Sequence, residues 1–76
     1  MFSKKIFSER IHTLRIARNI KQEDVANAVG LKKSAISLVE KGERAVSIEV
    51  LYALADYFDV SLDYLVGRSD NPEINH

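Results

Sequence analysis

Residues 22–42 read Gln-Glu-Asp-Val-Ala-Asn-Ala-Val-Gly-Leu-Lys-Lys-Ser-Ala-Ile-Ser-Leu-Val-Glu-Lys-Gly, and this stretch decides the fold. It predicts two short helices, over residues 22–29 and 33–41, with Gly30 at the turn, because glycine adopts a left-handed backbone without a Cβ clash. One apolar face runs along each helix. These faces comprise Val25, Ala26 and Val29, then Ile36 and Val39. If the faces meet, the helices cross steeply, with the small Ala26 at the closest approach.

The 76 residues make one small domain, and the absence of cysteine excludes a disulfide or a thiolate metal site. No apolar run approaches the roughly 20 residues of a membrane span. Residues 1–10 lack the apolar core of a signal peptide. We therefore expect a cytoplasmic protein with no membrane partner.

The zero net charge hides a strong asymmetry. Residues 1–46 contain ten Lys or Arg and five Asp or Glu, a net charge of +5. Residues 47–76 contain one Arg and six Asp or Glu, a net charge of −5. Uneven scatter of surface charge is the alternative explanation, but the pattern favours one basic face and one acidic face, with the basic half around residues 22–42.

Apolar spacing predicts three further helices, over residues 4–18, 48–58 and 62–66. Each is preceded by a serine suited to the N-cap: Ser3, Ser47 and Ser61. In the first helix Phe7, Ile11, Leu14 and Ala17 form the apolar face, and His12 lies on the outer face. With no strand pattern, the chain is predicted to be all-α, a compact five-helix bundle over residues 1–67. Residues 68–76 are polar and contain proline, so they predict a loose C-terminal tail.

Lysine stands where the second and third helices need a capping acceptor, at Lys21 and Lys32. Lysine cannot accept a hydrogen bond from the free N–H groups of a helix start. Water satisfies these groups in the free protein, and a phosphate would satisfy them while pairing with the lysine.

Residues 7–67 resemble the Cro/repressor-type family of helix-turn-helix DNA-binding regulators, also called the XRE family, whose fold is lambda-repressor-like. The matching motifs lie in the family's order. They are Arg10-Ile11-xx-Leu14-Arg15, Gln22-xx-Val25-Ala26-xx-Val29-Gly30-Leu31, Ile36-Ser37-xx-Glu40-Lys41-Gly42, Ser47-xxx-Leu51-xx-Leu54-Ala55 and Val60-Ser61-Leu62-Asp63-Tyr64-Leu65. The resemblance implies a transcriptional regulator, most simply a repressor that binds a palindromic operator as a homodimer.

The resemblance also implies roles for single residues. Gln22 matches a glutamine that touches a DNA phosphate, and Arg15 and Glu40 match a structural salt bridge between the first and third helices. Residues 33–41 match the helix that lies in the major groove. The outward side chains there match those that commonly read bases: Lys33, Ser34, Ser37 and Leu38, with Ala35 and Lys41 at the margins. Further phosphate ligands are predicted at Lys21, Lys32, Lys41, Arg44 and Asn19, each with a solvated surface role as its alternative.

Lys33 is the strongest base reader of the set, since its ammonium can donate to guanine O6 and N7. Leu38 either contacts a thymine methyl group or packs on Arg44 and the following loop.

Double-stranded DNA and a second copy of the chain are the predicted partners. The acidic half carries more apolar side chains than one short helix can bury, and family members dimerise through this region. The predicted dimer interface comprises Val60, Leu62, Tyr64, Leu65 and Val66, with Ile74, Tyr52 and Tyr57 nearby.

The residue pattern argues against an enzyme. His12 and His76 are far apart, no cluster has metal-ligand spacing and no glycine-rich phosphate loop occurs, so no metal or cofactor is expected. Two alternatives remain within binding functions. One is a protein-interaction module such as an antitoxin. The other is a transcription-activating controller that touches RNA polymerase through Glu23, Asp24 or Glu43.

Overall fold

The computed structural model describes residues 2–74, which form five helices. They are α1 (Lys4–Ala17), α2 (Gln22–Val29), α3 (Lys33–Glu40), α4 (Ile48–Phe58) and α5 (Leu62–Leu65). Within residues 2–74 no strand occurs, and no helix is long and apolar enough to cross a membrane. The all-α, five-helix prediction is confirmed, and every helix end lies within one residue of its predicted position.

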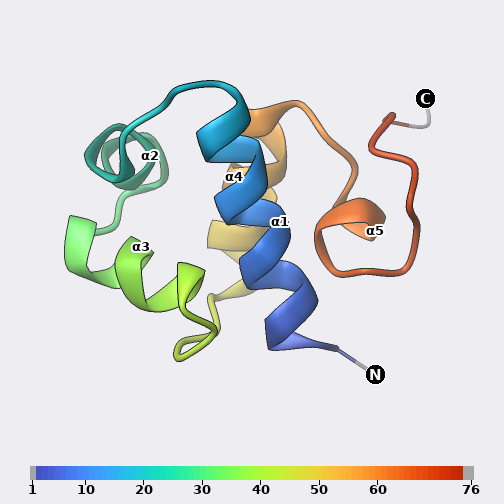
Figure 1. The fold of residues 1–76 in the computed structure, drawn as a ribbon, viewed down its shortest axis with the longest axis horizontal. Coiled ribbons are helices and arrows are strands. Elements are labelled where there is room, and N and C mark those ends of the chain that lie inside the picture. The colour runs from blue at the N-terminus through green and yellow to red at the C-terminus, as the bar shows by residue number, and fades with distance from the viewer. Residues whose placement is uncertain (1, 75–76) are drawn as a thin grey trace.

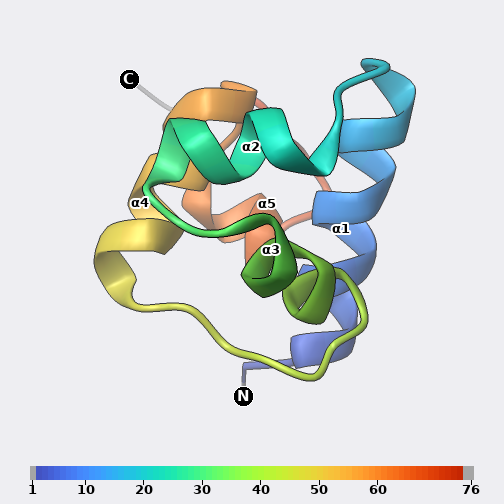
Figure 2. The ribbon, with the colours of Figure 1, turned by 90° about the vertical axis from the view of Figure 1, so that its left-hand side faces the viewer.

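The helices α1 and α4 lie in the middle of the molecule, with α2 and α3 on one side and α5 on the other (Figure 1). Seen from the α3 side, α2 crosses above α3 and the two are joined by the turn at Gly30 (Figure 2). The basic half of the chain therefore supplies one side of the molecule, and the acidic half supplies the other.

One apolar core joins all five helices. Its members that are at least 98% buried are Phe7, Ile11, Val25, Ala26, Ile36, Val39, Leu54, Phe58 and Leu65. Ala26 is 1% exposed, as expected of a small residue between crossing helices. Two predictions were wrong. Ala17, predicted on the apolar face of α1, is exposed, and Ala35, predicted at the margin of α3, is 5% exposed and belongs inside.

The turns explain why the helices end where they do. Gly30 has φ 77° and donates its N–H to the Ala26 carbonyl, which closes α2. Asn19, with φ 57°, lets the chain leave α1. The predicted serine caps are confirmed: the hydroxyls of Ser3, Ser47 and Ser61 accept hydrogen bonds from the N–H groups of Ile6, Val50 and Tyr64, respectively.

The segment after α5 is not a loose tail, which corrects the prediction for residues 68–74; residues 75 and 76 lie outside the described part. The Ser61 N–H donates to the Pro72 carbonyl at 2.9 Å. Arg10 reaches from α1 to the Tyr64 carbonyl, the Ser69 carbonyl (2.6 Å) and the Asp70 carboxylate (2.9 Å). This polar segment is thus held through its backbone carbonyls. Because every residue has a carbonyl, the residue types did not predict these contacts.

Candidate nucleic-acid interface

The outward face of α3 is a narrow polar strip with one apolar member. Ile36 and Val39 are fully buried, so the helix is fixed against the core by its inner face. The strip faces solvent: Lys33 and Ser34 are exposed, Ser37 is half-buried and Leu38 is 39% exposed. The structure thus brings together all four side chains that were predicted to read bases.

Positive charge borders this strip at the starts of α2 and α3. Lys21 and Lys32 occupy the N-cap positions, and neither side chain makes a capping hydrogen bond. Between the two starts runs an open groove that holds about 340 Å³ and is lined by Arg15, Lys21, Gln22, Glu23 and Lys33. Free backbone donors and two exposed ammonium groups make this groove suited to an anion.

The other predicted phosphate ligands are all exposed. Asn19 lies just before α2 and is exposed. Lys41 and Arg44 are exposed in the chain that follows α3. The predicted ligands therefore come from the chain that precedes α2 and from the chain that flanks α3, and these three side chains are exposed.

A buried carboxylate, Glu40, ties the end of α3 to α1 and α2. Its Oε2 accepts a hydrogen bond from Arg15 Nε at 2.6 Å, so the predicted ion pair is present. Its Oε1 accepts from the terminal nitrogen Nη2 of Arg15 (2.9 Å), from His12 Nδ1 (2.8 Å) and from Gln22 Nε2 (3.3 Å). One side chain at the end of α3 thereby gathers donors from both α1 and α2.

These contacts set the charge states of the pair. Burial opposes ionisation of Glu40, but the hydrogen bonds from Arg15, His12 and Gln22 outweigh it and hold the pKa of Glu40 below its usual value. The hydrogen bond to Glu40 raises the pKa of Arg15. Both groups are therefore ionised at neutral pH, and Gln22 is oriented before any ligand arrives.

Two residues in these networks were not predicted from the sequence. His12 was placed on the outer face of α1, yet its ring bonds to Glu40 from 28 residues away. Its position three residues before Arg15, on the same side of the helix, is the signal that could have found it. Arg10 was part of a family motif without a role, and its guanidinium lies 4.2 Å above the Tyr64 ring.

The predicted dimer surface needs correction. Val60 is 4% exposed and Leu65 is fully buried, so both belong to the core of one chain and cannot contact a second copy. Tyr64 and Val66 are half-buried. Of the five predicted residues, only Leu62, which is 38% exposed, offers a large free apolar surface.

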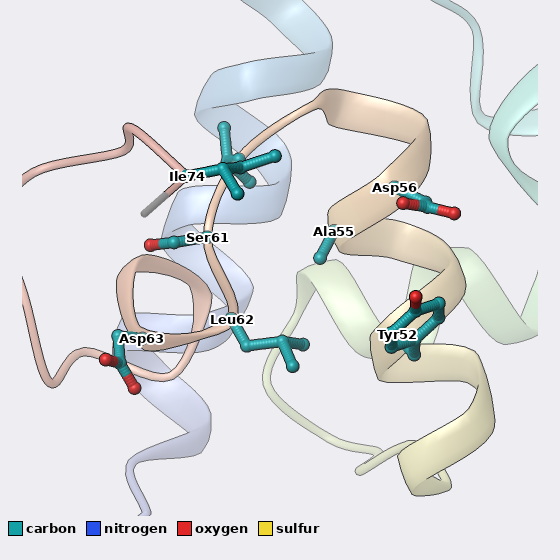
Figure 3. A pocket seen from close by; sticks show the side chains of 8 residues that line it. Tyr52, Ala55, Asp56, Ser61, Leu62, Asp63 and Ile74 are labelled. Carbon is teal, nitrogen blue, oxygen red and sulfur yellow. The ribbon is translucent and has the colours of Figure 1, made fainter. Parts of the chain in front are cut away.

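An apolar groove nevertheless exists beside Leu62. It holds about 400 Å³ between α4, α5 and the segment after α5. Tyr52, Leu62 and Ile74 line it from these three parts of the chain, with Asp56 and Asp63 at its edges (Figure 3). Tyr52 is 61% exposed, and Ile48, one turn earlier on α4, is 72% exposed.

A family model described as helix-turn-helix matches residues 11–65. A transcriptional repressor, RstR of a cryptic phage in Vibrio cholerae, is 35% identical over 65 residues, which cover 86% of this chain and 59% of that protein. The chain therefore spans about three fifths of the length of that curated relative.

Solved structures share the fold. The P22 c2 repressor, determined in complex with a synthetic operator, superposes with a TM-score of 0.79 at 33% identity, over 84% of this chain and 97% of that one. The restriction-modification controller protein C.AhdI from Aeromonas hydrophila superposes with a TM-score of 0.75 at 34% identity, over 82% of this chain and 94% of that one.

Proposed function

Because the chain belongs to the helix-turn-helix family of Cro/repressor type, as its motifs indicated, we propose that it is a sequence-specific DNA-binding transcriptional regulator that places α3 in the major groove. The observation that carries this proposal is the exposed strip of α3, which is fixed on a buried inner face and bordered by exposed lysines. Lys33 donates to guanine, Leu38 contacts a thymine methyl group, and Ser34 and Ser37 add contacts of low specificity.

Phosphates bind on both sides of this strip. Gln22, held by Glu40 at the start of α2, donates to one phosphate together with the free N–H groups of that helix. Lys21, Lys32, Lys41, Arg44 and Asn19 supply the remaining backbone contacts. These contacts fix the register of α3 on the duplex without reading its sequence.

The protein acts as a homodimer on a palindromic operator. The second copy packs on the face formed by Ile48, Tyr52, Leu62 and Ile74, where apolar side chains are exposed away from α3. The molecule measures 30 × 23 × 22 Å, so two copies side by side suit half-sites about one DNA turn, or ~34 Å, apart. This assignment replaces Val60 and Leu65 by side chains that a partner can reach.

Repression is the simplest output, because a dimer bound at a promoter excludes polymerase. An activating controller is the second candidate, favoured by one observation: Glu23, Asp24 and Glu43 are exposed beside the proposed DNA face. Carboxylates so placed are free to touch a basic surface of RNA polymerase.

Selection of bound sequences from random duplex DNA tests the proposal. We expect a palindrome with half-sites about one turn apart, bound by a species of twice the monomer mass. Leu62→Asp should shift the protein toward monomer and weaken operator binding, while Asp56→Asn, at the edge of the same groove, serves as the matched control. Weak, wholly salt-sensitive binding with no enriched sequence would instead favour a protein-interaction module such as an antitoxin.

A further inference from the structure

His12 holds one ring nitrogen against a buried carboxylate and leaves the rest of the ring open. Its Nδ1 lies 2.8 Å from Glu40 Oε1, and its side chain is 53% exposed whereas that of Glu40 is 5% exposed. An ionised carboxylate can only accept hydrogen bonds, so Nδ1 carries the proton. In the neutral ring the second nitrogen, Nε2, then bears a lone pair and cannot donate to a phosphate oxygen.

The ring lies beside a proposed phosphate ligand. Glu40 Oε1 also accepts from Gln22 Nε2 at 3.3 Å. Because the two hydrogen bonds to this oxygen are 2.8 and 3.3 Å long, His12 Nδ1 and Gln22 Nε2 are at most 6.1 Å apart. The imidazole therefore lies next to Gln22, the proposed phosphate ligand at the start of α2.

We propose that His12 is a DNA-phosphate ligand in its protonated state, donating from Nε2 while Nδ1 stays on Glu40, so that DNA binding takes up one proton. The inference rests on the proposed DNA-binding function and adds a ligand and a pH dependence to that surface. Imidazole is the side chain that ordinarily changes charge between pH 5 and 8. Protonation supplies the missing donor and adds one positive charge next to the DNA.

The charged groups nearest to His12 come from α1 and α3. Glu40 faces it from α3, and Arg15 and Glu9 lie about one turn away on α1. From α2 it is approached by the uncharged Gln22. Toward α5, Arg10 is engaged with Tyr64, Ser69 and Asp70. The pKa of Glu40 is lowered, so this carboxylate stays ionised between pH 5.5 and 7.5 and keeps accepting from Nδ1.

Operator affinity of the full chain, measured by fluorescence anisotropy at pH 7.5 and 5.5 and constant ionic strength, tests this. We expect wild-type affinity to rise about tenfold toward pH 5.5, the strength of one hydrogen bond to a charged group. The salt slope should steepen by about one at pH 5.5. His12→Gln keeps a donor for Glu40 and should abolish both changes. His12→Lys, charged throughout, should bind equally at both pH values.

The second histidine provides the matched control, because the chain contains only His12 and His76. His76→Gln should retain the full pH dependence. A flat wild-type profile with tight binding, or a pH dependence that survives in His12→Gln, would overturn this inference and leave the proposed function standing. Failure of the wild type to bind any selected duplex at either pH would overturn the proposed function together with the inference.

Discussion

Arg15 and Glu40 meet through two hydrogen bonds, from Arg15 Nε to Oε2 at 2.6 Å and from Arg15 Nη2 to Oε1 at 2.9 Å, although 25 residues separate them. Two bonds between planar groups fix direction as well as distance. The end of α3 is thereby oriented relative to α1, which sets the angle at which the exposed strip is presented. The pair therefore fixes the orientation of α3 through geometry.

Replacing Glu40 by Gln should destabilise the fold, because the Arg15 guanidinium, whose side chain is 12% exposed, loses its counter-charge. We expect the free energy of unfolding at pH 7 to fall by about 2–4 kcal/mol. The folded-state pKa of Glu40 is lowered, so its contribution is present above the unfolded pKa and is lost as pH falls through the folded value.

Urea titrations of wild type and Glu40→Gln between pH 7 and pH 3 would measure this dependence. The difference between the two proteins should shrink as the pH falls below about 4, where carboxylates protonate. The exposed Glu43 offers a control, and Glu43→Gln should stay close to wild type throughout. A difference that stayed constant over the whole range would contradict an ionised Glu40 as the stabilising group.

Lys33→Ala and Lys32→Ala separate base reading from phosphate binding on adjacent residues. Lys33 is the first residue of α3, and Lys32 is its N-cap. We expect Lys33→Ala to relax the preference at one position of each half-site, at about 1–3 kcal/mol for the favoured base. Lys32→Ala should weaken all sequences evenly and lower the salt slope by about one.

Binding-site selection repeated with both variants provides the measurement. An unchanged base preference in Lys33→Ala would show that the register assigned to α3 on the DNA is wrong.

Gly67, which follows α5, and Gly30, which ends α2, allow the cost of a steric clash to be separated from the cost of a left-handed backbone. Both have positive φ, 84° and 77°, so alanine is strained at either position. A Cβ at Gly30 would meet nothing within 4 Å, whereas a Cβ at Gly67 would lie 2.9 Å from Ile6 Cγ2. We expect Gly30→Ala to lower the free energy of unfolding by about 1–2 kcal/mol, and Gly67→Ala by about 1 kcal/mol more.

Chemical denaturation of the two variants would reveal this difference. Adding Ile6→Ala should recover the extra cost in the Gly67 variant, because it removes the clashing methyl group. Equal costs at the two glycines would mean that Ile6 moves aside freely.

Arg10→Ala should release the segment after α5. Arg10 is 19% exposed at its side chain and holds two backbone carbonyls and one carboxylate there. Hydrogen exchange of the Ser61 amide, which bonds to Pro72, reports whether the segment stays docked. We expect exchange to quicken about tenfold or more, as when about 1.4 kcal/mol of local stability is lost.

Asp70→Ala is the control for this experiment. The Asp70 side chain is fully exposed, so its ion pair with Arg10 contributes little. An equal acceleration in both variants would assign the docking to the ion pair and not to the carbonyl contacts.

Local features were predictable from the residue pattern, whereas contacts between distant segments were not, apart from the Arg15–Glu40 pair that the family resemblance implied. Gly30, the serine caps and the inner face of α3 follow from spacing and residue type within a few positions. Val60 and Leu65 are predicted at a dimer interface because the acidic half carries more apolar side chains than one short helix can bury. In the structure α5 packs against both α1 and α4, so Val60 and Leu65 are buried within one chain. The contacts of His12 and Arg10 span 28 to 60 residues, and no periodicity encodes such pairs.

The lysines at the N-caps of α2 and α3 imply a trade-off between stability and function. A serine or aspartate there would stabilise the free domain by roughly 1 kcal/mol for each helix. The same acceptor would occupy the donors that a phosphate needs, and aspartate would repel it. The free domain is thus less stable than it would be with capped helices. A bound duplex would restore that stability, so the two helix starts would become better ordered as DNA binds.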